Sequence, residues 1–283
     1  MSLFYSQARA SGTLLFGCVL SLGIMGCGVD QYEIRLRQSK DYYNYLEKIE
    51  QNLAPKWSDG RIVEMIRVPK QFQPIPAPVP VKNEDGNEEI GVDARQPDYM
   101  NLVFPTAELV GAWEAPFSVV VSDGTADTRK AYIYVLSNYW KFLGDDPAEA
   151  LKFTDAMVQL VGDALEDHIP PDKLENPQTE PHPKRGGYLP ESLYKVYTFQ
   201  PKPIKHRSTE RESTVNYTFS MYARQNANIQ AIVLVVLPAN TSSQEKLDER
   251  ISMMLEHFLI TKTEPKPAQG QSGGAAPANP TGF

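Results

Sequence analysis

Apolar residues follow two kinds of spacing along the chain, and the first kind predicts helices. Asp30–Leu53 and Asp146–Glu166 place apolar residues three and four positions apart among charged ones, which is typical of amphipathic helices. The aspartate that opens the second stretch is expected to be its N-cap. A third helix is expected to start at Ser242 or Ser243, where Glu245 would complete a capping box with Ser242.

The second kind of spacing, alternation or a short continuous apolar run, predicts strands. Phe117–Ser122 and Ala131–Leu136 flank a turn-rich connection and are expected to form a hairpin. Ile229–Leu237 is almost entirely apolar, which is typical of a central strand buried on both faces. The remaining expected strands are Arg61–Val68, Leu193–Phe199 and Thr214–Ala223.

Proline and polar residues dominate the segments between these elements. Phe72–Pro80 is expected to be a polyproline-type linker, and Asn83–Asp93 a solvated acidic loop. The second helix is expected to stop at His168-Ile169-Pro170-Pro171, and a Pro-rich, charged loop is expected to follow through Pro190. Proline, glycine and alanine fill most of residues 263–283, which are therefore expected to be a disordered tail.

These elements predict an α+β fold in which a largely antiparallel sheet is covered by amphipathic helices. An N-terminal helix precedes this domain, and the tail follows it. The N-terminal helix is expected to pack on the domain; a stalk or a partner-binding helix is the alternative.

The first 27 residues carry a different pattern, which indicates export. One cation, Arg9, precedes an apolar stretch from about Thr13 to Met25, which is too short for a transmembrane helix but suits a secretory signal. The stretch ends in Ile24-Met25-Gly26-Cys27. This motif resembles the lipobox of bacterial lipoproteins, although Met25 is less usual than alanine or serine at its position.

The lipobox resemblance implies a modified and processed N-terminus. In that family the cysteine thiol takes a diacylglyceryl group, the signal peptide is cut before it, and the new amine is acylated, for example with palmitate. Cys27 is thus the expected lipidation site, and acyl chains on Cys27 would hold the protein on a membrane. Because Gly28 rather than aspartate follows it, the family's sorting rule implies the outer rather than the inner membrane.

The expected organisation is therefore a signal peptide over 1–26, the lipidated cysteine and N-terminal helix over 27–57, the α+β domain over 58–262, and the tail over 263–283. The protein would face the periplasm or the cell surface.

Composition narrows the possible functions. Hydrophobic residues make up 41% and charged residues 22% of the 283 positions, as in folded proteins. The formal charge of -7 argues against a nucleic-acid partner.

The chain has two cysteines, Cys18 and Cys27, and the predicted signal peptide contains the first. The mature chain would therefore have no disulfide, cysteine metal site or cysteine nucleophile.

Candidate catalytic and metal-binding motifs are weak. Ser192 and Lys195 fit S-x-x-K but begin a strand-like run, which would point them to opposite faces. Gly270–Gly274 fits G-x-S-x-G but lies in the expected tail. Asp123 and Asp127 lack the further acids of a calcium loop.

The four histidines are His168, His182, His206 and His257, and no two have metal-ligand spacing. We expect His168 and His182 to be solvated loop residues, with a zinc site assembled in three dimensions as the alternative. No cofactor, metal or catalytic residue is therefore assigned.

The order of strands and terminal helix over Leu193–Leu259 is similar to that of PsbP-like α/β/α sandwich domains, which implies an assembly or accessory role. The first functional expectation is a lipid-anchored, non-catalytic binding domain with an unknown envelope protein partner. The alternatives are an envelope hydrolase or small-ligand-binding enzyme with a site made of scattered residues, and a structural spacer.

Overall fold

The computed structural model describes residues 31–82, 88–97, 102–120, 124–144, 147–184, 187–202, 204–205, 214–239, 241 and 244–266. The predicted signal peptide, Cys27 and the tail from residue 267 onward lie outside these ranges. The chain divides into two compact units, Met1–Gln51 and Asn52–Phe283. A helix covers residues 31–52, as the spacing predicted. All of it except its last residue belongs to the first unit.

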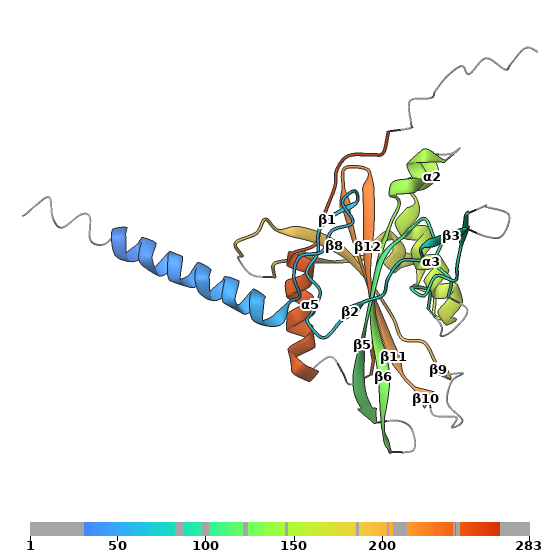
Figure 1. Cartoon of the computed structure of the whole chain (residues 1–283), viewed down its shortest axis with the longest axis horizontal. Helices are drawn as coiled ribbons and strands as arrows, with labels where there is room; N and C mark the ends of the chain where they lie inside the picture. The colour runs from blue at the N-terminus through green and yellow to red at the C-terminus, as the bar shows by residue number, and fades with distance from the viewer. Residues whose placement is uncertain are drawn as a thin grey trace, which may run out of the picture. The chain divides into compact units, whose positions relative to one another are not determined.

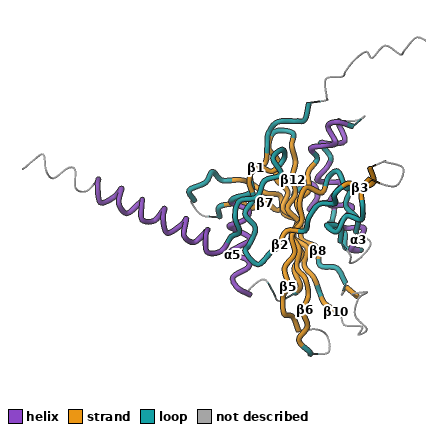
Figure 2. The backbone as a smooth tube through the Cα atoms, viewed as in Figure 1, coloured by secondary structure: helices purple, strands orange, loops and turns teal. Residues whose placement is uncertain are grey.

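The second unit is an α+β domain with a large antiparallel sheet (Figures 1 and 2). Its strands are β1 (Val63–Met65), β2 (Gln73–Pro74), β3 (Pro80–Lys82), β4 (Glu88–Ile90), β5 (Leu109–Val120), β6 (Ala126–Ser137), β7 (Gln178–His182), β8 (Ser192–Phe199), β9 (Ile204–Lys205), β10 (Thr214–Val215), β11 (Tyr217–Asn226), β12 (Ile229–Pro238) and β13 (Leu259–Ile260). Its helices are α2 (Pro147–Ala150), α3 (Phe153–Leu165), α4 (Pro171–Glu175), α5 (Leu247–Glu256) and the 3-10 turns η1 (Tyr139–Leu143) and η2 (Gln244–Lys246).

Seven strands form the main sheet in the order β2-β5-β6-β12-β11-β8-β7. Two long hairpins, β5–β6 and β11–β12, supply its centre, and β12 pairs with both β6 and β11. Leu234 of β12 lies opposite Tyr134 on one side and Met221 on the other. The prediction that Ile229–Leu237 is a central strand is therefore confirmed.

The central strand contributes to a separate apolar cluster on each face of the sheet. Ile232, Leu234 and Val236 pack with α3 in one cluster. Val233 and Val235 pack with α5 and Phe258 in the other. Figure 1 shows α3 and α5 on opposite sides of the sheet, so the domain has an α/β/α arrangement. The continuous apolar run of β12 follows from this, because its side chains are buried in both directions.

The predicted helix over Asp146–Glu166 is broken, and its cap comes from elsewhere. Residues 151–152 separate α2 from α3, and Asp146 lies outside the described residues. At the start of α3, the Gln230 side-chain oxygen accepts hydrogen bonds from the Thr154 amide at 3.0 Å and the Thr154 hydroxyl at 2.8 Å. The Gln230 amide nitrogen donates to the Leu151 carbonyl at 2.8 Å. A residue of the central strand thus satisfies backbone groups at the break and fixes where α3 begins.

The last helix also begins later than predicted. α5 starts at Leu247, and η2 precedes it. Glu245 and Lys246 have positive φ angles of 49° and 57°, and Lys246, the N-cap residue, makes no side-chain capping hydrogen bond. Because consecutive left-handed residues cannot belong to an α-helix, the capping box expected at Glu245 does not form. Ser242 and Ser243 lie outside the described residues.

The segments expected to be loops contain short elements. Gln73 and Pro74 of the predicted polyproline linker form β2 at one edge of the sheet, with Phe72 buried beside them. The Pro-rich stretch after residue 167 contains α4 and the edge strand β7. Edge positions tolerate proline, because one side of an edge strand needs no ladder hydrogen bonds. Composition alone therefore did not predict the short strands and the helix in these two segments.

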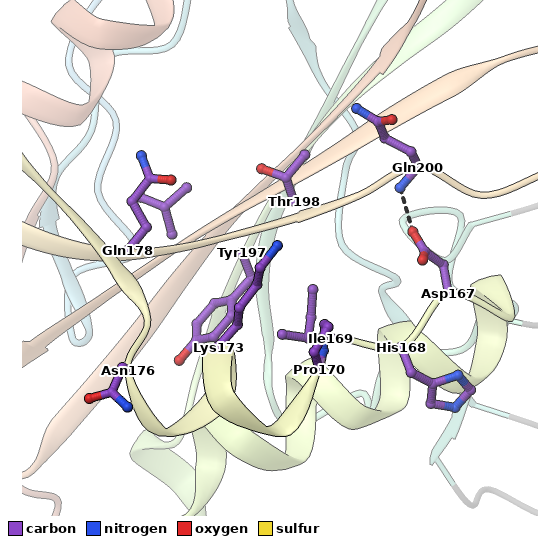
Figure 3. Close-up of a pocket in the computed structure, with 11 residues that line it drawn as sticks. Asp167, His168, Ile169, Pro170, Lys173, Asn176, Gln178, Tyr197, Thr198 and Gln200 are labelled. Atoms are coloured by element: carbon purple, nitrogen blue, oxygen red, sulfur yellow. Dashed lines mark hydrogen bonds between the residues drawn. The ribbon is translucent and has the colours of Figure 1, made fainter.

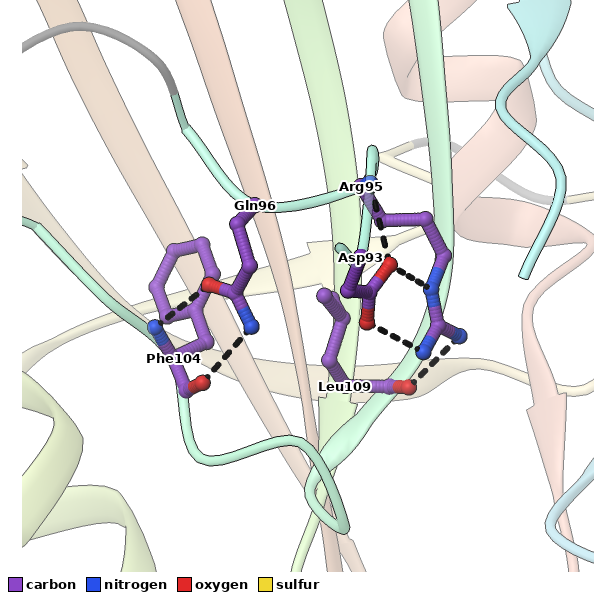
Figure 4. A network of polar contacts seen from close by, with 5 residues as sticks. All are labelled: Asp93, Arg95, Gln96, Phe104 and Leu109. Atoms are coloured by element: carbon purple, nitrogen blue, oxygen red, sulfur yellow. Dashed lines mark hydrogen bonds and ion pairs between the residues drawn. The ribbon is translucent and has the colours of Figure 1, made fainter. Parts of the chain in front are cut away.

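Asp93, expected in a solvated loop, is instead half-buried, and its side chain, 7% exposed, forms an ion pair with the buried Arg95 (Figure 4). Its carboxylate accepts hydrogen bonds from the Arg95 side chain at 2.8 and 2.7 Å. Arg95 also donates to the Leu109 carbonyl at 3.0 Å, which ties this loop to the start of β5. The Arg95 guanidinium holds the pKa of Asp93 below its usual value, against the opposing effect of burial.

Candidate functional site

Two of the three described histidines are buried, contrary to the expectation for His182. His168 follows α3, is 65% exposed and lies 2.8 Å from the Asp163 carboxylate. His257 is buried at the end of α5, with its Nδ1 at 2.8 Å from the Met253 carbonyl. His182 ends β7 and is only 2% exposed. The solvated-loop prediction is therefore wrong for His182, because β7 joins the sheet and packs beneath α5.

His182 lines a cavity of about 410 Å³ between the sheet and α5. Residues from β7, β11, β12 and α5 line it. The polar lining residues are Glu180, His182, Lys184, Thr218, Ser220, Tyr222, Asp248 and Ser252, and the apolar ones include Val235, Leu237, Ile251 and Leu255. The cavity, called here the His182 cavity, is large enough for a small organic molecule.

The His182 imidazole has one clear hydrogen-bond partner. Its Nδ1 lies 3.3 Å from the Ser252 hydroxyl of α5. Its buried Nε2 has no hydrogen-bond partner, and the nearest carboxylate oxygen, Oε2 of Glu180, lies at 3.7 Å. Buried polar atoms are nearly always hydrogen-bonded in folded proteins, so this nitrogen marks a place for a ligand or an ordered water.

Burial keeps the ionisable rings of this region neutral at pH 7. It lowers the pKa of His182, and the nearby Lys184 charge acts in the same direction. Burial and the negative charges of Glu180 and Asp248 raise the pKa of Tyr222 to about 12. Burial likewise raises the pKa of Tyr194 to about 12, and the Tyr194 hydroxyl donates to the Leu255 carbonyl at 2.7 Å.

Ser252, His182 and Glu180 lie in the order of a nucleophile, a base and an acid, but the helix that carries Ser252 supplies no free backbone donor beside it. Ser252 lies past the first turn of α5, where backbone N–H groups donate to carbonyls within the helix. These groups therefore cannot form an oxyanion hole beside the Ser252 hydroxyl.

A second and larger concavity, of about 800 Å³, lies along the C-terminal half of β8, on the same edge that β7 pairs with (Figure 3). β7 pairs with β8 as far as Val196, so the following residues of β8 have no strand partner on that side among the residues that the structure describes. Lining residues of this Tyr197 groove include His168, Lys173, Asn176, Gln178, Tyr197, Thr198 and Gln200. At one end the Asp167 carboxylate accepts a hydrogen bond from the Gln200 backbone N–H at 2.6 Å.

The Tyr197 hydroxyl is the unusual group of this groove. Tyr197 is 3% exposed, and its hydroxyl has no hydrogen-bond partner. Burial and the negative charge of Asp155 raise its pKa, so the phenol is neutral at pH 7. Figure 3 shows its ring beside Lys173 of α4, whereas Thr198 and Gln200 lie along β8 on the side away from α4. Hydroxyl and amide side chains both donate and accept, so the groove offers paired hydrogen bonds to a polar partner.

The other predicted candidates do not come together in a site. Ser192 is buried and Lys195 is exposed on β8, so the S-x-x-K pair points to opposite faces, as predicted. Asp127 pairs with Arg129 at 2.8 Å. Cys27, Asp123, His206 and Gly270–Gly274 lie outside the described residues. Within the described ranges, no group of three or more His, Cys, Asp or Glu side chains could hold a metal ion.

Sequence reasoning missed the His182 cavity because its parts are distant in the chain. Ser252 is 70 positions from His182, and Tyr222 comes from a third element. One local signal was present: Glu180 and His182 are two positions apart, which places them on the same face of a strand. The prolines around them hid that strand.

Comparison with known protein families, curated proteins and solved structures finds no match to this chain. Among the described residues, no helix combines the length and apolar character that a membrane span requires.

Proposed function

We propose that this chain is a lipid-anchored protein of the bacterial envelope whose α+β domain binds an envelope component without transforming it. The anchor is supported by the sequence Ile24-Met25-Gly26-Cys27, which follows an apolar stretch of signal-peptide length. Acyl chains on Cys27 would tether the domain to a membrane, the outer one by the identity of Gly28.

The observation that carries the binding function is the Tyr197 groove. It combines a buried, unpartnered hydroxyl with side chains that both donate and accept hydrogen bonds, beside the edge of β8 that β7 does not reach. Such a surface suits a polar partner that lies along the strand edge, as in strand-edge recognition of peptides. An envelope protein is the partner class we favour. The likeness to PsbP-like domains supports the same accessory role.

Site-specific photo-crosslinking in intact cells tests the binding function. A photoreactive residue at Lys173, inside the groove, should give one defined adduct with an envelope component. The same residue at Lys195, which is exposed on β8 outside the groove, is the matched control. If both positions give the same products, or if Lys173 gives none, the groove does not bind a partner.

A hydrolase is the second candidate, because the Ser252 hydroxyl lies 3.3 Å from His182. A fluorophosphonate probe distinguishes the two functions, since it labels activated serines. We expect no labelling of the wild-type protein, because the backbone N–H groups around Ser252 are bonded within α5 and cannot form an oxyanion hole. Labelling that disappears in Ser252→Ala would establish the hydrolase instead.

A further inference from the structure

The His182 cavity combines negative charge, an apolar wall and an unsatisfied nitrogen. Its lining includes the carboxylates of Glu180 and Asp248 and one cation, Lys184. With His182 and Tyr222 neutral at pH 7, the lining carries a net negative charge. Val235 and Leu255 belong to its apolar side. This combination favours a ligand that has both a positive charge and a hydrocarbon part.

Glu180 and His182 offer two neighbouring acceptor atoms that one donor can bridge. Oε2 of Glu180 and Nε2 of His182 are 3.7 Å apart, which is too far for a good hydrogen bond between them. A nitrogen about 2.8 Å from each would donate to both, since charge-assisted N–H···O⁻ bonds have that length. The Nδ1–H of His182 would then donate to the Ser252 hydroxyl, which leaves Nε2 as an acceptor.

The second carboxylate strengthens the attraction for a cation at this position. Glu180 and Asp248 lie on different elements, β7 and the first turn of α5, and the charges of both act on the Tyr222 hydroxyl. The Tyr222 ring adds an aromatic wall, and aromatic faces attract ammonium groups. A positive charge in this space would therefore experience two carboxylates at once.

We propose that the His182 cavity binds a small organic ammonium ion, with its nitrogen between Glu180 and His182 and its apolar body against Val235 and Leu255. A metal ion fits less well, because these side chains do not converge as metal ligands within the described residues. The volume of about 410 Å³ suits an amine with a short alkyl chain or a single ring. The proposal rests on the cavity alone, independently of the lipid anchor and the Tyr197 groove.

Lys184 is the competing cation. Its ammonium lies 3.2 Å from Oε2 of Glu180, but its side chain is 60% exposed. Exposed ion pairs contribute little to stability, so a ligand can displace this contact at small cost. Lys184→Met should therefore tighten amine binding, because it removes both the competitor and a like charge.

Calorimetric titration of the full chain in detergent at pH 7.5 tests the proposal. Benzylammonium is the probe, and benzyl alcohol and benzoate are the matched neutral and anionic controls. Benzylammonium should bind at least about tenfold more tightly than either control, the difference expected for a charge-assisted contact. Equal binding of the amine and the alcohol would overturn the proposal. An ordered water between Glu180 and His182 would then be the better explanation of the unpartnered nitrogen.

Three variants locate the binding. Glu180→Gln and Asp248→Asn should each weaken benzylammonium binding by about tenfold, since each removes one attracting charge. Glu191→Gln removes an equal charge from an exposed position outside the cavity and should change nothing. If all three variants bind the amine as the wild type does, the amine lies elsewhere and the proposal is wrong. The ligand selectivity of the wild type remains decisive if a variant does not fold.

The nitrogen NMR signal of His182 separates ligand binding from a purely structural role of this residue, because only a bound ligand would shift it. The Nε2 resonance of His182, assigned by its loss in His182→Gln, should shift on addition of benzylammonium and stay unchanged with benzyl alcohol. A shift of His168 in place of His182 would contradict the assignment of the site.

Discussion

At the scale of single residues, the fold depends on a few positions whose backbone or charge is unusual. Ala227 is one of them, because it has a φ of 54° in the two-residue turn between β11 and β12. Asparagines flank it on both sides and tolerate left-handed backbone better, but the left-handed residue is the alanine. Left-handed conformations cost about 1 kcal/mol for residues with a Cβ, and glycine avoids that cost.

Ala227→Gly should therefore stabilise the domain by about 0.5–1 kcal/mol and raise the melting temperature by about 2–4 °C. Ala227→Val should lower it, since β-branched residues are the least suited to positive φ. Thermal unfolding followed by circular dichroism measures both changes. A lower melting temperature for the glycine variant would show that this turn has another conformation.

The buried ionisable residues predict how stability depends on pH. His182 and His257 have lowered pKa values because burial disfavours the charged imidazole. The unfolded chain therefore binds more protons than the folded chain as the pH falls below about 6.5, and stability declines. Asp93, with its lowered pKa, adds a further loss below about pH 4, where the unfolded carboxyl becomes protonated.

Urea unfolding at pH 7.0 and pH 5.0 measures this effect. The free energy of unfolding should be smaller at pH 5.0, and His257→Gln should reduce the difference, because glutamine does not titrate. His168→Gln is the control, because this histidine is exposed to solvent and its replacement should leave the difference unchanged. A wild-type stability that rises from pH 7.0 to pH 5.0 would contradict the neutral, buried state of these histidines.

At the scale of elements, β12 connects the two apolar clusters and the start of α3. Because Leu234 is fully buried in the cluster beneath α3, Leu234→Ala should cost about 2–5 kcal/mol. Leu193→Ala removes the same atoms from an exposed position on β8 and should cost less than about 0.5 kcal/mol. Chemical denaturation of both variants measures the difference. Similar losses would mean that β12 is not the central strand.

The cap of α3 gives a second prediction at this scale. Gln230→Ala should destabilise the domain by about 1–3 kcal/mol, because it leaves the Thr154 amide and the Leu151 carbonyl without their partner. Gln159→Ala, on the exposed face of α3, should cost only a few tenths of a kcal/mol. A loss for Gln230→Ala as small as that for Gln159→Ala would show that water replaces the cap.

The same elements show what the sequence could predict. The strand β12 and the β5–β6 hairpin were predictable, because their apolar patterns come from local alternation and burial. The beginning of α3 was not, because its cap is a glutamine 76 positions away. The strand β7 was missed since its burial depends on packing beneath α5 and not on its own composition. The His182 cavity, built on β7, was missed for the same reason.

At the scale of the whole molecule, a predicted lipid anchor precedes a domain with two candidate binding sites. The domain was predicted as α+β from the order of its elements, and the described sheet and helices confirm that class. Its function stays a proposal. The predicted anchor is the premise for the proposed envelope partner, since it would determine where the domain meets one.

The intact mass of the protein extracted from membranes tests this premise most directly. We predict a chain that begins at Cys27, without residues 1–26, and carries a diacylglyceryl group and an amide-linked acyl chain on that residue. Cys27→Ala should accumulate as the unprocessed precursor. An unmodified Cys27, or a mature chain that begins at another residue, would contradict the lipid anchor and the envelope function built on it.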